Sequence, residues 1–237
     1  MKLGPRAREQ LTRLASVWEQ GEHVLVTGGT GSGKTLLARY LDEIRVKRGG
    51  SVVVFVCKTR PDPTILNHYR GWTRWTEWHK RPTASENRIL LWPKVENKSP
   101  TDAVAIMRDT FRRALDEIGR TGRWTAHLDE GLFMTDPQFL GLRAQVGMMY
   151  SLMRAAGGTM ITLAQRPAHL PVAIYPNLSH AFVGRARELP DVKRLADMDG
   201  RSSSRELADM IRANGLHDFT WIPIATDREP ERLNLAR

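Results

Sequence analysis

The sequence predicts an α/β fold of three layers, in which helices cover both faces of a mostly parallel central sheet. Two observations lead to this prediction. Apolar, β-branched runs of strand length recur along the chain, as at 51–57 and 159–164, and such runs are typical of parallel strands buried on both faces. Segments with apolar residues at helical spacing alternate with them, which favours strand–helix–strand units.

Each element has its own sequence signals. Ser99-Pro-Thr-Asp starts a helix, the glycine pairs 49–50 and 157–158 end helices, and Pro223 makes the last strand an edge strand. We expect helices at 6–19, from 34 to the stop signal at 48–50, at 99–119, from Pro137 to 157–158, and at 203–214. We expect strands at 23–26, 51–57, 88–92, 124–128, 159–164, 180–183 and 219–224.

The 237 residues suit one α/β domain, which we place at 1–225. Within it, residues 58–87 are expected to be an irregular basic and aromatic insertion, and 226–237 a polar C-terminal tail. The tryptophans of the insertion recur every three residues, at Trp72, Trp75 and Trp78. They fit either one stripe of a short helix packed on the core or aromatic platforms for nucleic acid on a basic surface.

Composition bounds the partners and the compartment. Lys and Arg number 36 against 26 Asp and Glu, and the resulting net charge of +10 favours a polyanionic partner. The single cysteine, Cys57, lies in an apolar run and is expected to be a small core hydrophobe, which fits a reducing cytosol. Because no window is long and apolar enough for a membrane span or a signal peptide, we expect a soluble, cytoplasmic protein.

The most informative motif runs from His23 to Thr35 and matches G-x-x-x-x-G-K-T between a strand and a helix. A chance glycine-rich turn is the alternative, but the full pattern stands in the one context that would confirm a phosphate-binding loop (Walker A). Lys34 would reach the β- and γ-phosphates, and the Thr35 hydroxyl would hold Mg²⁺, so ATP and Mg²⁺ are the expected cofactors. The expected nucleotide-binding residues are Gly28, Gly29, Thr30, Gly31, Ser32, Gly33, Lys34 and Thr35.

Two further positions suggest hydrolysis. Asp129 and Glu130 follow a predicted strand at its carboxyl end, where α/β sheets bind ligands. Asp129 would hold the metal and Glu130 would polarise the attacking water (Walker B), although a solvated surface pair is the alternative. Gln165 directly follows the strand at 159–164, so its amide is expected beside the γ-phosphate, with turn chemistry before Pro167 as the other explanation.

These residues, with Leu152-Met-Arg-Ala-Ala-Gly157, Ile161-Thr-Leu-Ala-Gln-Arg-Pro167 and Asn177, resemble the motor domain of the FtsK/HerA superfamily over about 23–200. The resemblance implies a RecA-like P-loop NTPase core, Mg²⁺-dependent ATP hydrolysis at subunit interfaces, and a hexameric ring with DNA in its channel. It also implies that Gln165 is a sensor of the γ-phosphate. Arg154 matches the arginine of the family motif and is the candidate for completing a neighbour's site, with Arg185 and Arg187 as rivals.

The expected function is therefore an ATP-hydrolysing motor that translocates or packages double-stranded DNA as a homo-oligomeric ring. The sequence departs from the family in having no membrane anchor, no winged-helix segment, and Cys57-Lys-Thr-Arg-Pro in place of an acidic motif. This suggests a reduced motor of the kind that a phage or mobile element encodes. The alternatives are an ATP-dependent assembly or loader switch without translocation and a phosphotransferase acting on a small molecule.

Overall fold

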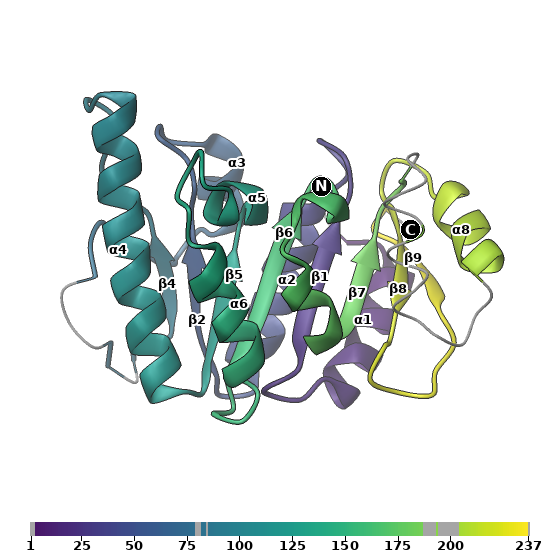
Figure 1. Ribbon diagram of the computed structural model, residues 1–237. Helices are drawn as coiled ribbons and strands as arrows, with labels where there is room; N and C mark the ends of the chain where they lie inside the picture. Colours follow the sequence, from purple (N-terminus) through teal and green to yellow (C-terminus); the bar gives the residue numbers. More distant parts are fainter. Residues whose placement is uncertain (1–2, 79–81, 84, 187–192, 194–203, 237) are drawn as a thin grey trace.

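The computed structural model describes residues 3–78, 82–83, 85–186, 193 and 204–236, and within them it has one nine-stranded sheet with helices on both faces (Figure 1). The strands are β1 (His23–Thr27), β2 (Ser51–Phe55), β3 (Thr73–Trp75), β4 (Arg88–Leu91), β5 (Trp124–Leu128), β6 (Thr159–Ala164), β7 (Leu178–Val183), β8 (Asp218–Ile222) and β9 (Glu231–Asn234). The helices are α1 (Pro5–Val17), α2 (Lys34–Lys47), α3 (Pro63–His68), α4 (Pro100–Thr121), α5 (Gly131–Thr135), α6 (Arg143–Leu152) and α8 (Ser204–Arg212), with 3₁₀ turns η1 (Pro167–His169) and η2 (Val172–Asn177).

The strand order is β3-β4-β2-β5-β6-β1-β7-β8-β9. Neighbouring strands from β3 to β7 pair in parallel, and only the pairs β7–β8 and β8–β9 of this sheet are antiparallel. Every residue of β1, β6 and β7 is buried, as expected for parallel strands with helices on both sides. The predicted three-layer α/β fold with a mostly parallel sheet is therefore confirmed.

Two helical layers cover the sheet. Helices α1 and α2 pack on one face with Val24 and Val26 of β1, whereas Leu25 points to the other face, toward the cluster that contains α4 and α6. Figure 1 shows α4 and α6 in front of the sheet, with α1 and α2 behind it. None of the helices in the described ranges is both long and apolar enough to cross a membrane.

Most predicted elements are confirmed to within a few residues. The predicted strands correspond to β1, β2, β4, β5, β6, β7 and β8, and four of the predicted helices correspond to α1, α2, α4 and, over the described residues, α8. The helix predicted from Pro137 is wrong in its start, because α6 begins at Arg143. The Asp136 carboxylate accepts a hydrogen bond from the Gln138 N–H (2.8 Å), and Gly141 has a φ of +65°. This side-chain-stabilised turn competes with helix formation around Pro137.

The insertion at 58–87 is more regular than expected, since it contributes α3 and the strand β3 to the fold. The expectation that its tryptophans pack on the core is confirmed, but the helical stripe and the exposed aromatic platforms are both wrong. Trp75 lies on a strand rather than a helix, and the three side chains are at most 8% exposed, so they offer no stacking surface. Trp72 packs in the cluster of α2 and α3, whereas Trp75 and Trp78 pack in the cluster of α4.

The C-terminal residues are not a free polar tail. Residues 231–234 form β9, which pairs antiparallel with β8 and is the edge of the sheet in place of β8. Leu233 and Leu235 are buried beneath α1, and the Gly4 N–H donates to the Leu235 carbonyl (3.1 Å). Pro223 follows β8 directly, which agrees with its inability to donate a hydrogen bond within a strand.

Candidate nucleotide-binding site

The predicted phosphate loop is the turn that joins β1 to α2 at the carboxyl edge of the sheet. Gly31 and Gly33 have φ values of +77° and +96°, a left-handed conformation that favours glycine. A Cβ added at Gly31 would find no atom within 4 Å, so this part of the loop faces open space. The predicted strand–loop–helix context of the motif is therefore present.

The loop offers groups that suit a phosphate. The Lys34 ammonium donates to the carbonyls of Gly28 (2.7 Å) and Gly29 (3.1 Å), which holds its charge over the loop. Helix α2 begins at Lys34, so its first N–H groups and the positive end of its dipole point toward the same place. The buried Ser32 hydroxyl has no hydrogen-bond partner among the described residues, which leaves a donor available to an anion.

Hydrogen bonds between neighbouring strands bring the other predicted residues to this edge. The Gly28 N–H donates to the carbonyl of Ala164 (3.2 Å), the residue that precedes Gln165. Glu130 follows β5, the other neighbour of β6, and the Gln165 side chain lies beside its carboxylate, where both residues line one cavity. Lys34, Asp129, Glu130 and Gln165 therefore lie at one edge of three adjacent strands, β1, β6 and β5.

Close backbone packing fixes the position of Glu130. A Cβ added at Gly131, the next residue, would lie 2.6 Å from a methyl group of Thr162 and 2.7 Å from one of Leu170. A side chain at 131 would have to displace these two residues, so glycine lets the chain pass close to β6 where it turns from β5 into α5. The stacked rings of Phe133 and Phe139 (centroids 4.9 Å apart) and Gln165 line a cavity of about 280 Å³ beside Glu130.

Burial and charge shift the pKa values of the ionisable groups at this edge. Burial raises the pKa of the Asp129 carboxyl, an effect that the charges of His127, Lys58 and Lys34 oppose. Burial and the neighbouring Asp129 charge raise the pKa of Glu130, although Lys34 and Lys58 oppose the shift. Burial lowers the pKa of Lys34 against the attraction of the two carboxylates. A raised pKa makes the Glu130 carboxylate a stronger base than a solvated one.

The donor set also suits a magnesium ion. Thr35 on the first turn of α2 is half-buried and offers a hydroxyl, and Asp129 is half-buried and offers a carboxylate. Hydroxyl and carboxylate oxygens, together with phosphate oxygens, are the ligands that Mg²⁺ prefers. Thr35 and Asp129 are the residues that would hold this ion.

Two residues that the sequence did not single out for the site lie beside the carboxylates. Lys58 interacts electrostatically with Asp129, Glu130 and Lys34, and Trp92 fixes its backbone by donating to the Lys58 carbonyl (2.8 Å). Cys57 is a half-buried thiol whose pKa is raised well above its usual value by burial and by both carboxylates, so it borders the site as well as the core. The sequence could have indicated this position, because both residues follow β2, and β2 is a neighbour of β5 in the sheet.

The three candidate arginines have different positions. Arg154 is exposed and lies at the amino edge of the sheet, because a Cβ added at Gly21, just before β1, would meet its backbone at 3.1 Å. One chain therefore does not bring Arg154 to its own phosphate loop. Arg185 is exposed and follows Gly184, whose N–H donates to the Thr27 carbonyl (2.7 Å) next to the loop. Arg187 lies outside the described residues.

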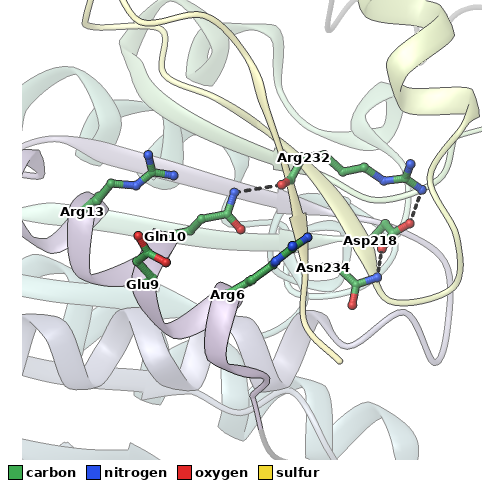
Figure 2. Close-up of a pocket in the computed structure, with 7 residues that line it drawn as sticks. All are labelled: Arg6, Glu9, Gln10, Arg13, Asp218, Arg232 and Asn234. Atoms are coloured by element: carbon green, nitrogen blue, oxygen red, sulfur yellow. Dashed lines mark hydrogen bonds and ion pairs between the residues drawn. The ribbon is translucent and has the colours of Figure 1, made fainter. Parts of the chain in front are cut away.

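A larger cavity of about 560 Å³ contains none of the predicted site residues (Figure 2). It lies between α1 and the antiparallel strands β8 and β9. Its charges are largely paired, since Arg232 contacts the Asp218 carboxylate and Arg13 forms an ion pair with Glu231 (2.8 Å). Next to Asp218, the His217 imidazole approaches the Ser32 carbonyl of the phosphate loop (3.4 Å).

Comparison with protein families gives a partial match. The model of the Sigma-54 interaction domain matches residues 3–73, the segment from α1 through the phosphate loop to the start of β3. No curated protein matches the sequence.

Comparison with solved structures covers nearly the whole chain. The genome-packaging NTPase B204 of Sulfolobus turreted icosahedral virus 2, in complex with AMPPCP, has a TM-score of 0.63 at 13% identity over 91% of this chain and 98% of that chain. The cytoplasmic domain of the Type VII secretion ATPase EccC of Thermomonospora curvata has 0.56 at 17% identity (92% and 26%). The pCW3 conjugation coupling protein TcpA with ATPγS has 0.55 at 14% identity (94% and 61%).

By their titles these neighbours are a genome-packaging NTPase, a secretion ATPase and a conjugation coupling protein, and they share the fold that the resemblance in the motifs implies. Identities of 13–17% establish a shared fold only. The chain has a RecA-like P-loop NTPase fold.

Proposed function

We propose that this chain is an Mg²⁺-dependent ATPase that translocates or packages double-stranded DNA as a homo-oligomeric ring. The observation that carries the proposal is the convergence of Lys34, Asp129, Glu130 and Gln165 at one sheet edge, with Gln165 beside the Glu130 carboxylate. A solvated surface pair of carboxylates would have neither this partner nor raised pKa values. Such an arrangement suits phosphoryl transfer, which needs charge neutralisation and an aligned nucleophile.

In this proposal each side chain has one task. Lys34 leaves the loop carbonyls and binds the β- and γ-phosphates, while Glu130 accepts a hydrogen bond from the attacking water and polarises it. Thr35 and Asp129 hold Mg²⁺, which when bound supplies positive charge to the phosphates. Gln165 changes partner between the Glu130 carboxylate and the γ-phosphate, and in this way it reports whether that phosphate is present.

Double-stranded DNA is the proposed partner because the chain carries a net charge of +10 and because one structural neighbour is a DNA-packaging ATPase from Sulfolobus turreted icosahedral virus. A protein that neutralises several phosphates releases counterions, so binding should weaken steeply with salt. We expect little sequence preference. An affinity that is equal at low and high salt would count against a polyanionic partner.

The position of Arg154 supports the proposed ring. Its guanidinium lies at the edge of the sheet opposite the chain's own phosphate loop, so it can complete a phosphate site only on a neighbouring copy. An arginine supplied in this way is worth on the order of 10³-fold or more in rate. Arg185 is the second candidate, because it already lies beside the loop of its own chain.

The first experiment measures ATP turnover with and without double-stranded DNA. We expect turnover that DNA stimulates, and Lys34→Ala should lose both nucleotide affinity and turnover because it removes the charge on the phosphates. Turnover that is unaffected by DNA would contradict the motor and favour a phosphotransferase. Nucleotide binding without turnover would favour an assembly switch.

The second experiment tests the ring by mixing subunits. Glu130→Gln protein has an intact arginine but no base, whereas Arg154→Ala protein has an intact base but no arginine. If Arg154 acts across an interface, the mixture hydrolyses ATP although each variant alone does not. Activity that is independent of protein concentration, together with no recovery in the mixture, would indicate a monomeric ATPase.

A further inference from the structure

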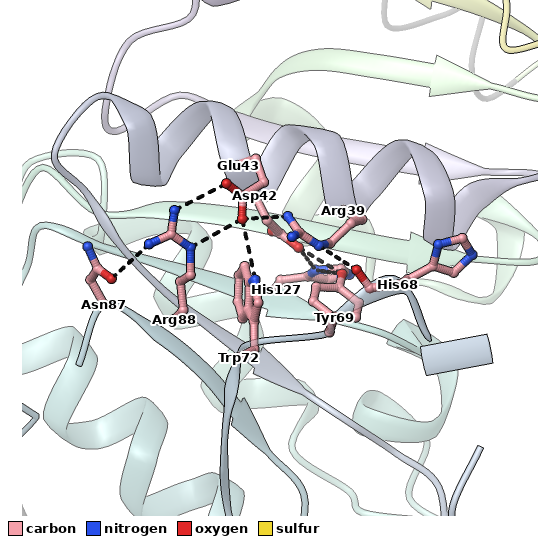
Figure 3. A network of polar contacts seen from close by, with 9 residues as sticks. All are labelled: Arg39, Asp42, Glu43, His68, Tyr69, Trp72, Asn87, Arg88 and His127. Carbon is pink, nitrogen blue, oxygen red and sulfur yellow. Dashed lines mark hydrogen bonds and ion pairs between the residues drawn. The ribbon is translucent and has the colours of Figure 1, made fainter. Parts of the chain in front are cut away.

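Three buried polar side chains join helix α2, strand β5 and the end of α3 (Figure 3). Asp42 and His127 are fully buried, and the Asp42 carboxylate lies 2.9 Å from His127 Nδ1. The Tyr69 hydroxyl donates to the same carboxylate oxygen at 2.8 Å and lies 3.3 Å from His127 Nδ1. Burial and the Asp42 charge raise the pKa of Tyr69 well above its usual value, so the phenol keeps the proton that it donates.

This network connects the two halves of the proposed phosphate site, which are the phosphate loop with α2 and the pair of carboxylates after β5. Asp42 lies about two helical turns after Lys34 on α2, and His127 lies two residues before Asp129 on β5. Strand β1, which leads into the phosphate loop, and strand β5, which leads into Asp129 and Glu130, are not neighbours, because β6 lies between them. Backbone hydrogen bonds therefore connect β1 and β5 only through β6. The contact between Asp42 and His127 is a direct side-chain link between the two halves.

A second set of contacts fixes the rotation of α2 about its axis. Arg39 donates to the His68 carbonyl (2.7 Å), and its guanidinium lies over the rings of Tyr69 and Trp72, 5.4 and 5.2 Å from their centroids. Glu43 forms ion pairs with Arg39 (2.6 Å) and Arg88 (3.2 Å). Positions 39, 42 and 43 of α2 are therefore all held against α3, β4 and β5.

Stability alone is a poor explanation for these buried charges. Burying a carboxylate and an imidazole is costly, and well-packed apolar residues in their place are often neutral or stabilising. The same face of the sheet is apolar on both sides of the network, with Ile161 and Leu163 of β6 in one cluster and Val52 and Val54 of β2 in another. An apolar side chain at 127 would thus continue the pattern of its neighbours.

We propose that Asp42, His127 and Tyr69 are positioning residues, which hold Asp129 and Glu130 in register with Lys34 and Thr35. This inference rests on the ATPase activity proposed above. Residues remote from the reacting atoms control rates in this way, because a misplacement of about 1 Å can cost about 10²-fold. Loosening the network should therefore lower kcat without abolishing nucleotide binding, because the phosphate loop itself is left intact.

The test compares His127→Ala with His127→Asn, whose amide nitrogen takes the place of Nδ1 and can donate to Asp42. We measure kcat and KM for ATP, the affinity for a fluorescent ATP analogue, and unfolding in urea. We expect His127→Ala to lower kcat about 10²-fold with the analogue affinity unchanged, and His127→Asn to restore part of the loss. Tyr69→Phe is the milder variant, because it removes one hydroxyl and leaves both charged partners; it should lower kcat less than His127→Ala.

The matched control is His180→Asn. His180 is also fully buried and faces a carboxylate, that of Glu22 at 3.5 Å, but it pairs with Val24 near the start of β1, far from the loop. We expect this variant to lose stability while its kcat stays at the wild-type value. If kcat is normal in the folded His127 and Tyr69 variants, or if it falls equally in His180→Asn, the positioning role is excluded. A wild-type chain without turnover would overturn the proposed function itself, and this inference with it.

Discussion

The surroundings of His23, the first residue of β1, predict how the free energy of unfolding depends on pH. Its side chain is fully buried, its Nδ1 accepts a hydrogen bond from the Met160 N–H (3.0 Å), and its Nε2 donates to the Tyr150 carbonyl (3.0 Å). The bond from Met160 requires an unprotonated Nδ1 and therefore the neutral imidazole, whereas the bond to Tyr150 can also be made by the protonated ring. Burial, which the bond to Tyr150 partly offsets, lowers the pKa of His23 from 6.5 to about 4, and the charge of Arg154 contributes to the decrease.

Proton linkage determines whether stability rises or falls with pH. Between about pH 6.5 and pH 4 the unfolded chain binds a proton at this histidine and the folded chain does not, so stability falls as the pH falls. The contribution is fully present above the unfolded pKa and is lost as the pH decreases toward the folded value. The lowered pKa of His23 corresponds to about 3 kcal/mol of unfolding free energy over the whole pH window. About 2 kcal/mol of it is lost between about pH 7 and pH 4.5.

The assay is urea unfolding of the wild type and His23→Asn across this range. Asparagine does not titrate, and its side-chain oxygen can accept from the Met160 N–H, although the bond to Tyr150 is lost at a cost of about 1–3 kcal/mol. The variant should therefore be less stable near pH 7 but should lose about 2 kcal/mol less on acidification. All other titrating groups are common to both proteins and cancel in the difference. Parallel stability curves for the two proteins would refute the reasoning.

Three further predictions concern the site and the two corrected segments. Glu130→Gln should bind an ATP analogue normally and lose turnover by about 10²–10⁴-fold; normal turnover would exclude Glu130 as the base. Trp75→Ala should lower the free energy of unfolding by about 3–5 kcal/mol with DNA affinity unchanged while the variant is folded; a loss of affinity alone would restore the platform interpretation. Leu233→Asp places a charge at a position 2% exposed and should lower the Tm, whereas an unchanged Tm would mean that 231–234 is a tail.

Signals that are local in the sequence predicted most of the fold. The phosphate loop is recognisable because its glycines, lysine and threonine are consecutive, and β6 because six apolar or β-branched residues follow one another. β9 has no such signal, since only Leu233 of its four residues is buried and its strand character comes from pairing with β8. The spacing of the tryptophans likewise predicts a helix at Trp75, and only the pairing of Trp75 with Leu91, which is distant in the sequence, shows that it lies on a strand.

The edge of the sheet at which Arg154 lies could have been predicted from its place before a strand, although the family motif alone does not indicate it. Residues that precede a parallel strand lie at the amino edge of the sheet, and residues that follow it lie at the carboxyl edge. Arg154 precedes β6 and Gln165 follows it, so the six residues of β6 separate them by about 20 Å. The same rule places Arg185, after β7, at the edge that holds the phosphate loop. The resemblance favours Arg154 and the topology keeps it from its own site, so a catalytic role for this arginine requires a second copy of the chain.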